Sequence, residues 1–164
     1  MGYIKPSATR RAKNGIVSPM NFPAKSFNNP SATEICQLLR EVHRIAVVGL
    51  SPNAARPSYR VAQALQSHGY TIIPVRPLAE KVLGEKAYAD LESLPGKVDM
   101  VDVFRAAEHV PAIVDSCIKL GIKNLWLQDG VIHEEAALRA QAAGMTVVMN
   151  RCVWRDYVTL CVES

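Results

Sequence analysis

The residues best suited to chemistry lie between 45 and 60, in the sequence IAVVGLSPNAARPSYR. An apolar run ends at Gly49, a polar loop follows, and Pro57 is typical of the first turn of a helix. A strand, a glycine-bearing loop and a helix N-terminus together present backbone N–H groups to a phosphate. Arg56 and Arg60 add planar guanidinium groups, which bond phosphate oxygens in pairs. We therefore predict a ligand that carries a nucleotide pyrophosphate.

Two features separate this pattern from the fingerprint of NAD-dependent dehydrogenases. The loop has one glycine where that fingerprint has three, so arginine side chains would replace part of the close backbone approach. An NAD site commonly has Asp or Glu after the second strand, to bond the ribose 2′-hydroxyl, and this chain has Arg76 there. Because an arginine prefers a phosphate, the sequence argues against NAD and leaves ligands with an extra ribose phosphate, such as NADP or coenzyme A.

Candidate catalytic residues are scarce. Of the four histidines, only His133, near the loop after the fourth predicted strand, could act as a general acid or base. Asp102 lies in an apolar run, where we expect it to accept local hydrogen bonds. The chain has no G-x-S-x-G elbow, Walker loop or paired carboxylates, and its four cysteines form neither a C-x-x-C pair nor a zinc pattern. We therefore predict no catalytic residues and no metal site, and reduced thiols packed as small hydrophobes.

Alternating strands and helices would position these residues. Ser31 and Glu34 have the spacing of a capping box, which predicts a helix from Ser31 to about His43. Amphipathic spacing predicts a further helix over 110–118. An Ala-rich segment with acidic residues in its first turn predicts another over 134–143, and a short helix is expected over 89–94. The apolar runs that predict strands are 45–49, 71–75, 98–104, 122–127 and 145–149. We predict an α/β fold, a doubly wound parallel five-stranded Rossmann-like sheet of order 3-2-1-4-5.

In such a sheet, ligands bind beyond the carboxyl ends of the strands, near the point where the strand order reverses. The residues expected at those ends are Gly49, Leu50 and Ser51 for the first strand, Val75, Arg76 and Pro77 for the second, Phe104 and Arg105 for the third, Gln128, Asp129 and Gly130 for the fourth, and Asn150 and Arg151 for the fifth.

The charge is unevenly distributed along the 164 residues. The chain has 19 basic and 15 acidic residues, but residues 1–28 hold five of the bases and no acid, so 14 basic and 15 acidic residues remain elsewhere. We predict a basic irregular arm over 1–30, a domain over 31–152 and a C-terminal extension over 153–164. The arm has no regularly spaced aromatic residues, so we do not expect it to bind nucleic acid.

No apolar run reaches the roughly 18 residues of a membrane span, and the N-terminus lacks the apolar core of a signal peptide. We therefore expect a cytoplasmic protein that does not bind membranes. The sequence leaves the oligomeric state open, a homo-oligomer included.

From about Asn29 to Arg151 the chain resembles the small bacterial CoA-binding proteins. These are single Rossmann-like domains similar to the N-terminal domain of the succinyl-CoA synthetase α subunit. The resemblance is carried by IAVVGLSPNAARPSYRVAQAL (45–65), VDMVDVFR (98–105), LWLQDG (125–130), EEAALRAQAAGMTVVM (134–149) and RC (151–152). The chain differs from the family where Arg76 replaces a usual Asn, and at His133, Asn150 and the final stretch.

The resemblance implies coenzyme A or an acyl-CoA in the crevice, with NADP a weaker alternative. It implies a ligand-binding set of Gly49, Leu50, Ser51, Arg56, Tyr59, Arg60, Val75, Pro77, Phe104, Arg105, Gln128 and Gly130, to which we add Arg76. The phosphorylated histidine of the synthetase lies in a separate domain, so the ligase reaction is not carried over.

We therefore expect a CoA-binding protein rather than an enzyme. One alternative is an NADP- or acyl-CoA-dependent enzyme with His133 as its acid or base. The other is an interaction module that uses the basic arm.

Overall fold

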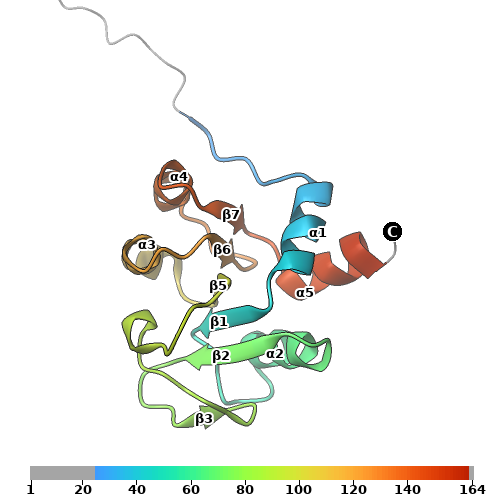
Figure 1. Ribbon diagram of the computed structural model, residues 1–164, viewed down its shortest axis with the longest axis vertical. Helices are drawn as coiled ribbons and strands as arrows, with labels where there is room; N and C mark the ends of the chain where they lie inside the picture. The colour runs from blue at the N-terminus through green and yellow to red at the C-terminus, as the bar shows by residue number, and fades with distance from the viewer. Residues whose placement is uncertain (1–24, 163–164) are drawn as a thin grey trace, which may run out of the picture.

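A sheet of five parallel strands forms the centre of the computed structural model, which describes residues 25–162 (Figure 1). The strands are β1 (Arg44–Val48), β2 (Thr71–Val75), β5 (Met100–Val103), β6 (Asn124–Leu127) and β7 (Thr146–Met149). Each strand pairs with its neighbours in parallel, with Val47 opposite Pro74 on one side and Asp102 on the other. The predicted α/β class and parallel five-stranded sheet are confirmed.

The order of the strands is β2-β1-β5-β6-β7, which is 2-1-3-4-5 when the strands are counted along the chain. The predicted order, 3-2-1-4-5, placed the third strand at the edge beside the second. Instead β5 lies between β1 and β6, because the chain crosses over β1 after β2. The strand order therefore reverses between β1 and β5, and this sets the place where a ligand crevice opens.

Helices cover both faces of the sheet (Figure 1). On one face, α1 (Ala32–Glu41), α2 (Pro57–Ser67) and α5 (Val153–Asp156) pack on alternate strand residues such as Ile45, Val47 and Trp126. On the other face, α3 (Val110–Lys119) and α4 (Glu134–Ala142) pack on Ala46 and Val101. Because both faces are covered, the strands consist of near-continuous apolar runs.

The predicted capping box begins α1. Ser31 Oγ accepts a hydrogen bond from Glu34 N at 3.2 Å, and Glu34 Oε2 accepts one from Ser31 N at 2.7 Å. Two backbone donors that a helix start leaves unpaired are thereby satisfied. The helices predicted over 110–118 and 134–143 are also present, as α3 and α4.

Most of the predicted N-terminal arm, residues 1–24, lies outside the described residues. Residues 25–30 have no regular secondary structure, but they dock on the domain. Asn29 bonds both the N–H and the carbonyl of Met149, at 2.8 and 3.0 Å, and Phe27 packs on the core beside α4. This segment satisfies exposed backbone groups of β7, which is an edge strand of the sheet.

The connection from β2 to β5 differs from the sequence prediction. It contains a small hairpin, β3 (Lys81–Val82) and β4 (Glu85–Lys86), and the helix expected over 89–94 is only a 3₁₀ turn, Leu91–Ser93. Tyr88 returns to β2, where its carbonyl accepts a hydrogen bond from Arg76 N at 2.8 Å. The hairpin thereby fixes the backbone at the end of β2.

The end of the described chain also packs on the domain. After α5, a π-helical turn, Tyr157–Val162, lies against α1. The ring of Tyr157 stacks on that of Trp154 at a centroid distance of 5.6 Å. Within the described part of the chain, no helix has both the length and the apolar character needed to cross a bilayer.

Candidate functional site

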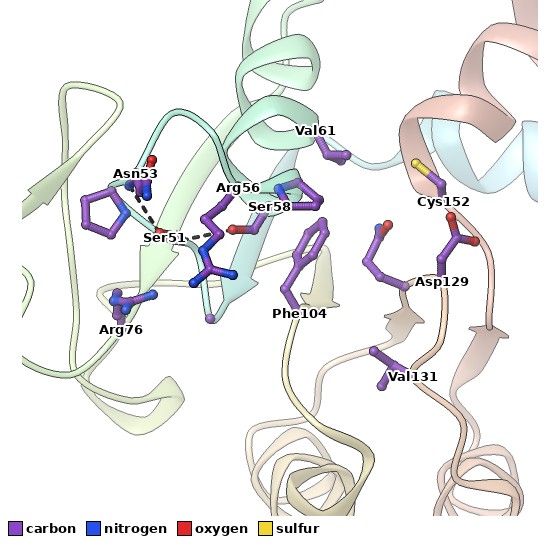
Figure 2. A pocket seen from close by; sticks show the side chains of 14 residues that line it. Ser51, Asn53, Arg56, Ser58, Val61, Arg76, Phe104, Asp129, Val131 and Cys152 are labelled. Atoms are coloured by element: carbon purple, nitrogen blue, oxygen red, sulfur yellow. Dashed lines mark hydrogen bonds between the residues drawn. The ribbon is translucent and has the colours of Figure 1, made fainter.

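A cleft of about 770 Å³ opens at the carboxyl ends of the strands, a volume in the range of small-molecule sites. Its walls come from the loop and first turn after β1, from the ends of β2, β5 and β6, and from the start of α5 (Figure 2). The lining residues are Gly49, Ser51, Pro52, Asn53, Arg56, Pro57, Ser58, Val61, Arg76, Phe104, Gln128, Asp129, Val131 and Cys152. The cleft therefore lies where the strand order reverses.

The chain after β1 passes so close to the end of β5 at Gly49 that there is no room for a side chain. A Cβ atom at this position would lie 2.4 Å from the carbonyl oxygen of Phe104, and the residue has φ +84°. Backbone hydrogen bonds hold it there, since Gly49 N donates to Val75 O and Phe104 N donates to Val48 O, both at 2.9 Å. Any side chain would push β1 away from β5 at the mouth of the cleft.

The side chains of the loop after β1 bond its own backbone. Ser58 Oγ, which is buried, accepts from Ser51 N at 3.0 Å, and Ser51 Oγ accepts from Asn53 N at 3.1 Å. Asn53 Oδ1 accepts from Ala55 N at 2.9 Å. These bonds shape the loop, and they also mean that several of its N–H groups already have partners.

The first turn of α2 retains free donors. Arg56 occupies the N-cap position without offering a side-chain acceptor, and Pro57 has no N–H. Within residues 25–162, no group accepts a hydrogen bond from the backbone N–H of Ser58 or Tyr59. An uncapped N-terminus of an 11-residue helix carries a partial positive charge and attracts anions.

Two arginines face the same end of the cleft. Figure 2 shows the guanidinium groups of Arg56 and Arg76 below the Ser51 loop, with Phe104 between them and the opposite wall. Among the described residues, neither guanidinium forms an ion pair or a hydrogen bond. By contrast, Arg139, Arg151 and Arg155 pair with Asp115, Asp156 and Asp129. The cleft therefore presents uncompensated positive charge beside free N–H donors.

A buried polar pair lies at the end of β6. Gln128 is 3% exposed, and its Nε2 donates to Asp102 Oδ1 at 2.7 Å. Asp102 is fully buried in β5, and its other oxygen has no partner among the described residues. Burial raises the pKa of Asp102 to about 7, against the opposing hydrogen bonds from Gln128 and the Val103 N–H. Because Nε2 is turned toward Asp102, the amide oxygen of Gln128 remains as an acceptor.

The cleft wall opposite the two arginines is bonded to α5. Arg155 forms two hydrogen bonds with Asp129, at 2.8 and 2.9 Å, and these hold the pKa of Asp129 below its usual range. Trp126 Nε1 donates to Arg151 O at 2.8 Å and fixes the turn that brings Cys152 to the cleft. Of the residues that build this wall, Arg155 lies in the predicted C-terminal extension and the others lie in the predicted domain.

The predicted site residues fall into three groups. Those that line the cleft are Gly49, Ser51, Arg56, Arg76, Phe104 and Gln128. Pro77 and Arg105 line an adjoining hollow. The remainder do not line the cleft: Leu50 and Val75 are buried, Tyr59 packs on the core, Arg60 is exposed, and Gly130 donates its N–H to Asn150 Oδ1 at 2.8 Å.

Sequence reasoning missed several lining residues. Ser58 and Val61 lie on successive turns of α2, so the amphipathic spacing of that helix could have assigned them to the cleft side. The sequence predicts Cys152 to be a packed thiol. In the structure it lines the cleft, because the turn after β7 directs the chain there. No local sequence signal specified that turn.

His133 has a structural role. It is the N-cap of α4, and its Nδ1 accepts a hydrogen bond from Ala136 N at 3.1 Å. A ring nitrogen that accepts a hydrogen bond carries no proton, and this one is already bonded to the first turn of α4. None of the residues that line the cleft is a histidine.

Several known proteins are similar to this chain. Residues 43–157 match the family described as "CoA binding domain". The chain is 40% identical over 127 residues to the uncharacterized protein YneT of Bacillus subtilis, covering 77% of this chain and 94% of YneT. It is similar to a hypothetical protein from Pyrococcus horikoshii, with a TM-score of 0.78, 33% identity, and coverage of 84% of this chain and 99% of that one.

A larger relative contains a similar region. Over 99 residues the chain is 30% identical to the ADP-forming acetate–CoA ligase II of Archaeoglobus fulgidus, covering 59% of this chain and 15% of the ligase. The remaining length of the ligase has no counterpart in this alignment.

Proposed function

The chain belongs to the CoA binding domain family, and from this premise we propose that it binds coenzyme A or an acyl-CoA in the cleft at the carboxyl ends of the strands. The pyrophosphate would lie at the N-terminus of α2, against the N–H groups of Ser58 and Tyr59 and the guanidinium of Arg56. We propose binding without catalysis, and therefore a carrier or sensor of the cofactor rather than an enzyme.

One observation supports the proposal most strongly. The start of α2 has free N–H donors and no side-chain cap, and the cleft beside it holds two arginines without acidic partners. Among the described residues, Asp115, Asp129 and Asp156 pair with other arginines and no carboxylate pairs with Arg56 or Arg76, so the charge of these two side chains is not neutralised. A ligand with adjacent phosphates satisfies the donors and the charge together.

The far end of the cleft suits the rest of the ligand. Phe104, Val61 and Val131 offer apolar surface, and the amide oxygen of Gln128 can accept a hydrogen bond from an N–H donor. The pantetheine arm of coenzyme A is a mostly apolar chain with amide groups. It therefore matches a cleft with a positive end and a mixed apolar and amide-bonding end.

The test is calorimetric titration of coenzyme A and acetyl-CoA into the protein and into Arg56→Ala. Loss of one charged hydrogen-bonding group costs about 1.5–3 kcal/mol, so the dissociation constant should rise about 10- to 150-fold. Arg40→Ala is the matched control, because it removes the same charge from the last turn of α1, which leads into the amino end of β1. It should leave the affinity unchanged.

Equal affinity in Arg56→Ala and the unmodified protein would remove the pyrophosphate from the start of α2. No binding of either cofactor by the unmodified protein would refute the function itself. Thermal unfolding gives a second readout, because ligand at about 100 times its dissociation constant adds roughly 2.7 kcal/mol to the free energy of unfolding.

The role of the basic arm can be separated from cofactor binding. A chain truncated before Lys25 keeps Phe27 and Asn29, which contact the domain, and removes only residues that the structure does not describe. This truncated chain should bind coenzyme A with unchanged affinity. A large loss of affinity would show that the arm takes part in the site.

A further inference from the structure

A second hollow, of about 320 Å³, adjoins the cleft on the side of β2. It shares Gly49, Arg76 and Phe104 with the cleft and adds Pro77 and Arg105. Two arginines therefore border a space directly beside the place proposed for the pyrophosphate.

Arg76 is held in place by its backbone. Its N–H donates to Tyr88 O at 2.8 Å, and Tyr88 N donates to Pro74 O at 3.0 Å, so the returning segment after the β3–β4 hairpin fixes the end of β2. The side chain is half-buried, and its guanidinium has no partner among the described residues. Five N–H donors on this group are available to a ligand.

Arg105 reaches the hollow from the loop that follows β5. A Cβ at Gly49 would lie 3.0 Å from Arg105 Cδ, so the side chain lies against the start of the β1 loop. One guanidinium nitrogen, NH2, bonds His109 Nε2 at 3.1 Å, which leaves donors on the other nitrogens.

Three acidic residues near Arg105 make contacts with other groups. Asp90 and Glu92 line a neighbouring hollow together with Arg105. Asp90 Oδ1 accepts from Ser93 N at 2.8 Å, and Glu92 Oε1 accepts from Ser116 Oγ at 2.5 Å. Glu108 Oε1 lies 3.8 Å from His109 Nε2, the nitrogen that Arg105 bonds. None of these three carboxylates forms an ion pair with Arg105, so the hollow keeps its positive charge.

We propose that Arg76 and Arg105 form a subsite for a phosphomonoester on the ribose of the bound nucleotide. Given the proposed function, on which this inference rests, that group is the 3′-phosphate of coenzyme A. Arg76 would then select cofactors that carry a ribose phosphate against those with a free ribose.

The place of Arg76 in the fold supports this assignment. In nucleotide-binding α/β sheets the residue after the second strand meets the ribose: a carboxylate there accepts from a hydroxyl, and an arginine accommodates a phosphate. The start of α2 and Arg56 can neutralise one pyrophosphate. The further arginines at the hollow, without acidic partners, are best matched by a separate anionic group on the same nucleotide.

The experiment compares coenzyme A with 3′-dephospho-coenzyme A, which differs only in that phosphate. The unmodified protein should bind coenzyme A at least about 10-fold more tightly than the dephospho form. Arg76→Gln should weaken coenzyme A by about that factor and leave the dephospho form within twofold. Arg56→Gln, the matched control in the same cleft, should weaken both ligands by the same factor.

Equal affinity of the unmodified protein for the two ligands would overturn the subsite, and so would an equal loss of both in Arg76→Gln. NADP and NAD form a second arm. If coenzyme A does not bind but NADP binds in preference to NAD through Arg76, the subsite stands and the proposed function fails. If no ribose-phosphate ligand binds, both fail. Thermal unfolding of each variant checks that it is folded.

Discussion

The buried carboxyl of Asp102 makes the stability of the fold dependent on pH. Asp102 lies in the central strand β5 with no exposed surface, and one of its oxygens has no partner among the described residues. Burial raises its pKa from 3.8 to about 7, against the opposing hydrogen bonds from Gln128 and Val103. The folded protein therefore binds this proton more strongly than the unfolded chain does.

The sign and size of the effect follow from linkage. Between pH 3.8 and about 7, the folded state holds the proton while the unfolded state has lost it, so the free energy of unfolding falls as the pH rises. Each pKa unit corresponds to about 1.4 kcal/mol, and the shift of about three units therefore costs about 4 kcal/mol above pH 7. Below pH 3.8, the group is neutral in both states and the cost disappears.

Asp102→Asn tests this reasoning, because the amide has the same shape, stays neutral and can still bond the Gln128 amide. We expect the variant to be the more stable protein at pH 8 by about 4 kcal/mol, with the difference shrinking by about 1.4 kcal/mol for each pH unit below 7. Urea unfolding of both proteins at pH 5, 6, 7 and 8 measures it. A difference that stays constant across this range would refute the raised pKa, since a change in hydrogen bonding alone does not vary with pH.

Two further predictions concern the frame of the site. Gly49→Ala should lower the free energy of unfolding by about 1–3 kcal/mol more than Gly84→Ala, since both residues have positive φ but only the Cβ at Gly49 would meet Phe104 O. Urea unfolding compares them, and equal losses would contradict the close approach. Asp99, which burial alone would make less acidic, accepts from Arg44 N and His43 N, and these bonds lower its pKa overall. The stabilisation from the ionised Asp99 is present above pH 3.8 and is lost as the pH falls through the lowered pKa. Asp99→Asn should therefore lower the free energy of unfolding by about 1 kcal/mol at pH 7 and by less below pH 4. A loss that does not vary with pH would argue against the lowered pKa.

Local patterns were enough for the five strands of the sheet, for helices α1 to α4 and for one end of the site. The Ser31 and Glu34 spacing specified the start of α1, and the apolar runs specified the five strands, because caps and burial on both faces depend on residues close in sequence. The placement of Arg56 at the start of α2 likewise followed from Pro57, whose fixed φ suits the first turn of a helix.

Other features depended on contacts between distant segments. The position of β5 beside β1 requires Gly49 to meet Phe104, which are 55 residues apart, and no local signal records that pairing. The free donors of α2 could not be counted from sequence either, because Ser58 Oγ turns back to accept a hydrogen bond from the loop, while its own N–H has no partner among the described residues.

The sequence alone therefore determined an α/β sheet with a glycine-bearing, positively charged loop after its first strand, since hydrophobic period, capping and residue charge are local properties. Only the tertiary structure decided which strands border the cleft, that Asp129 and Cys152 form its far wall, and that Arg76 and Arg105 share one hollow. These depend on which chain segments pack together. Packing of that kind is selected by the burial of the whole core, so no single stretch of sequence specifies it.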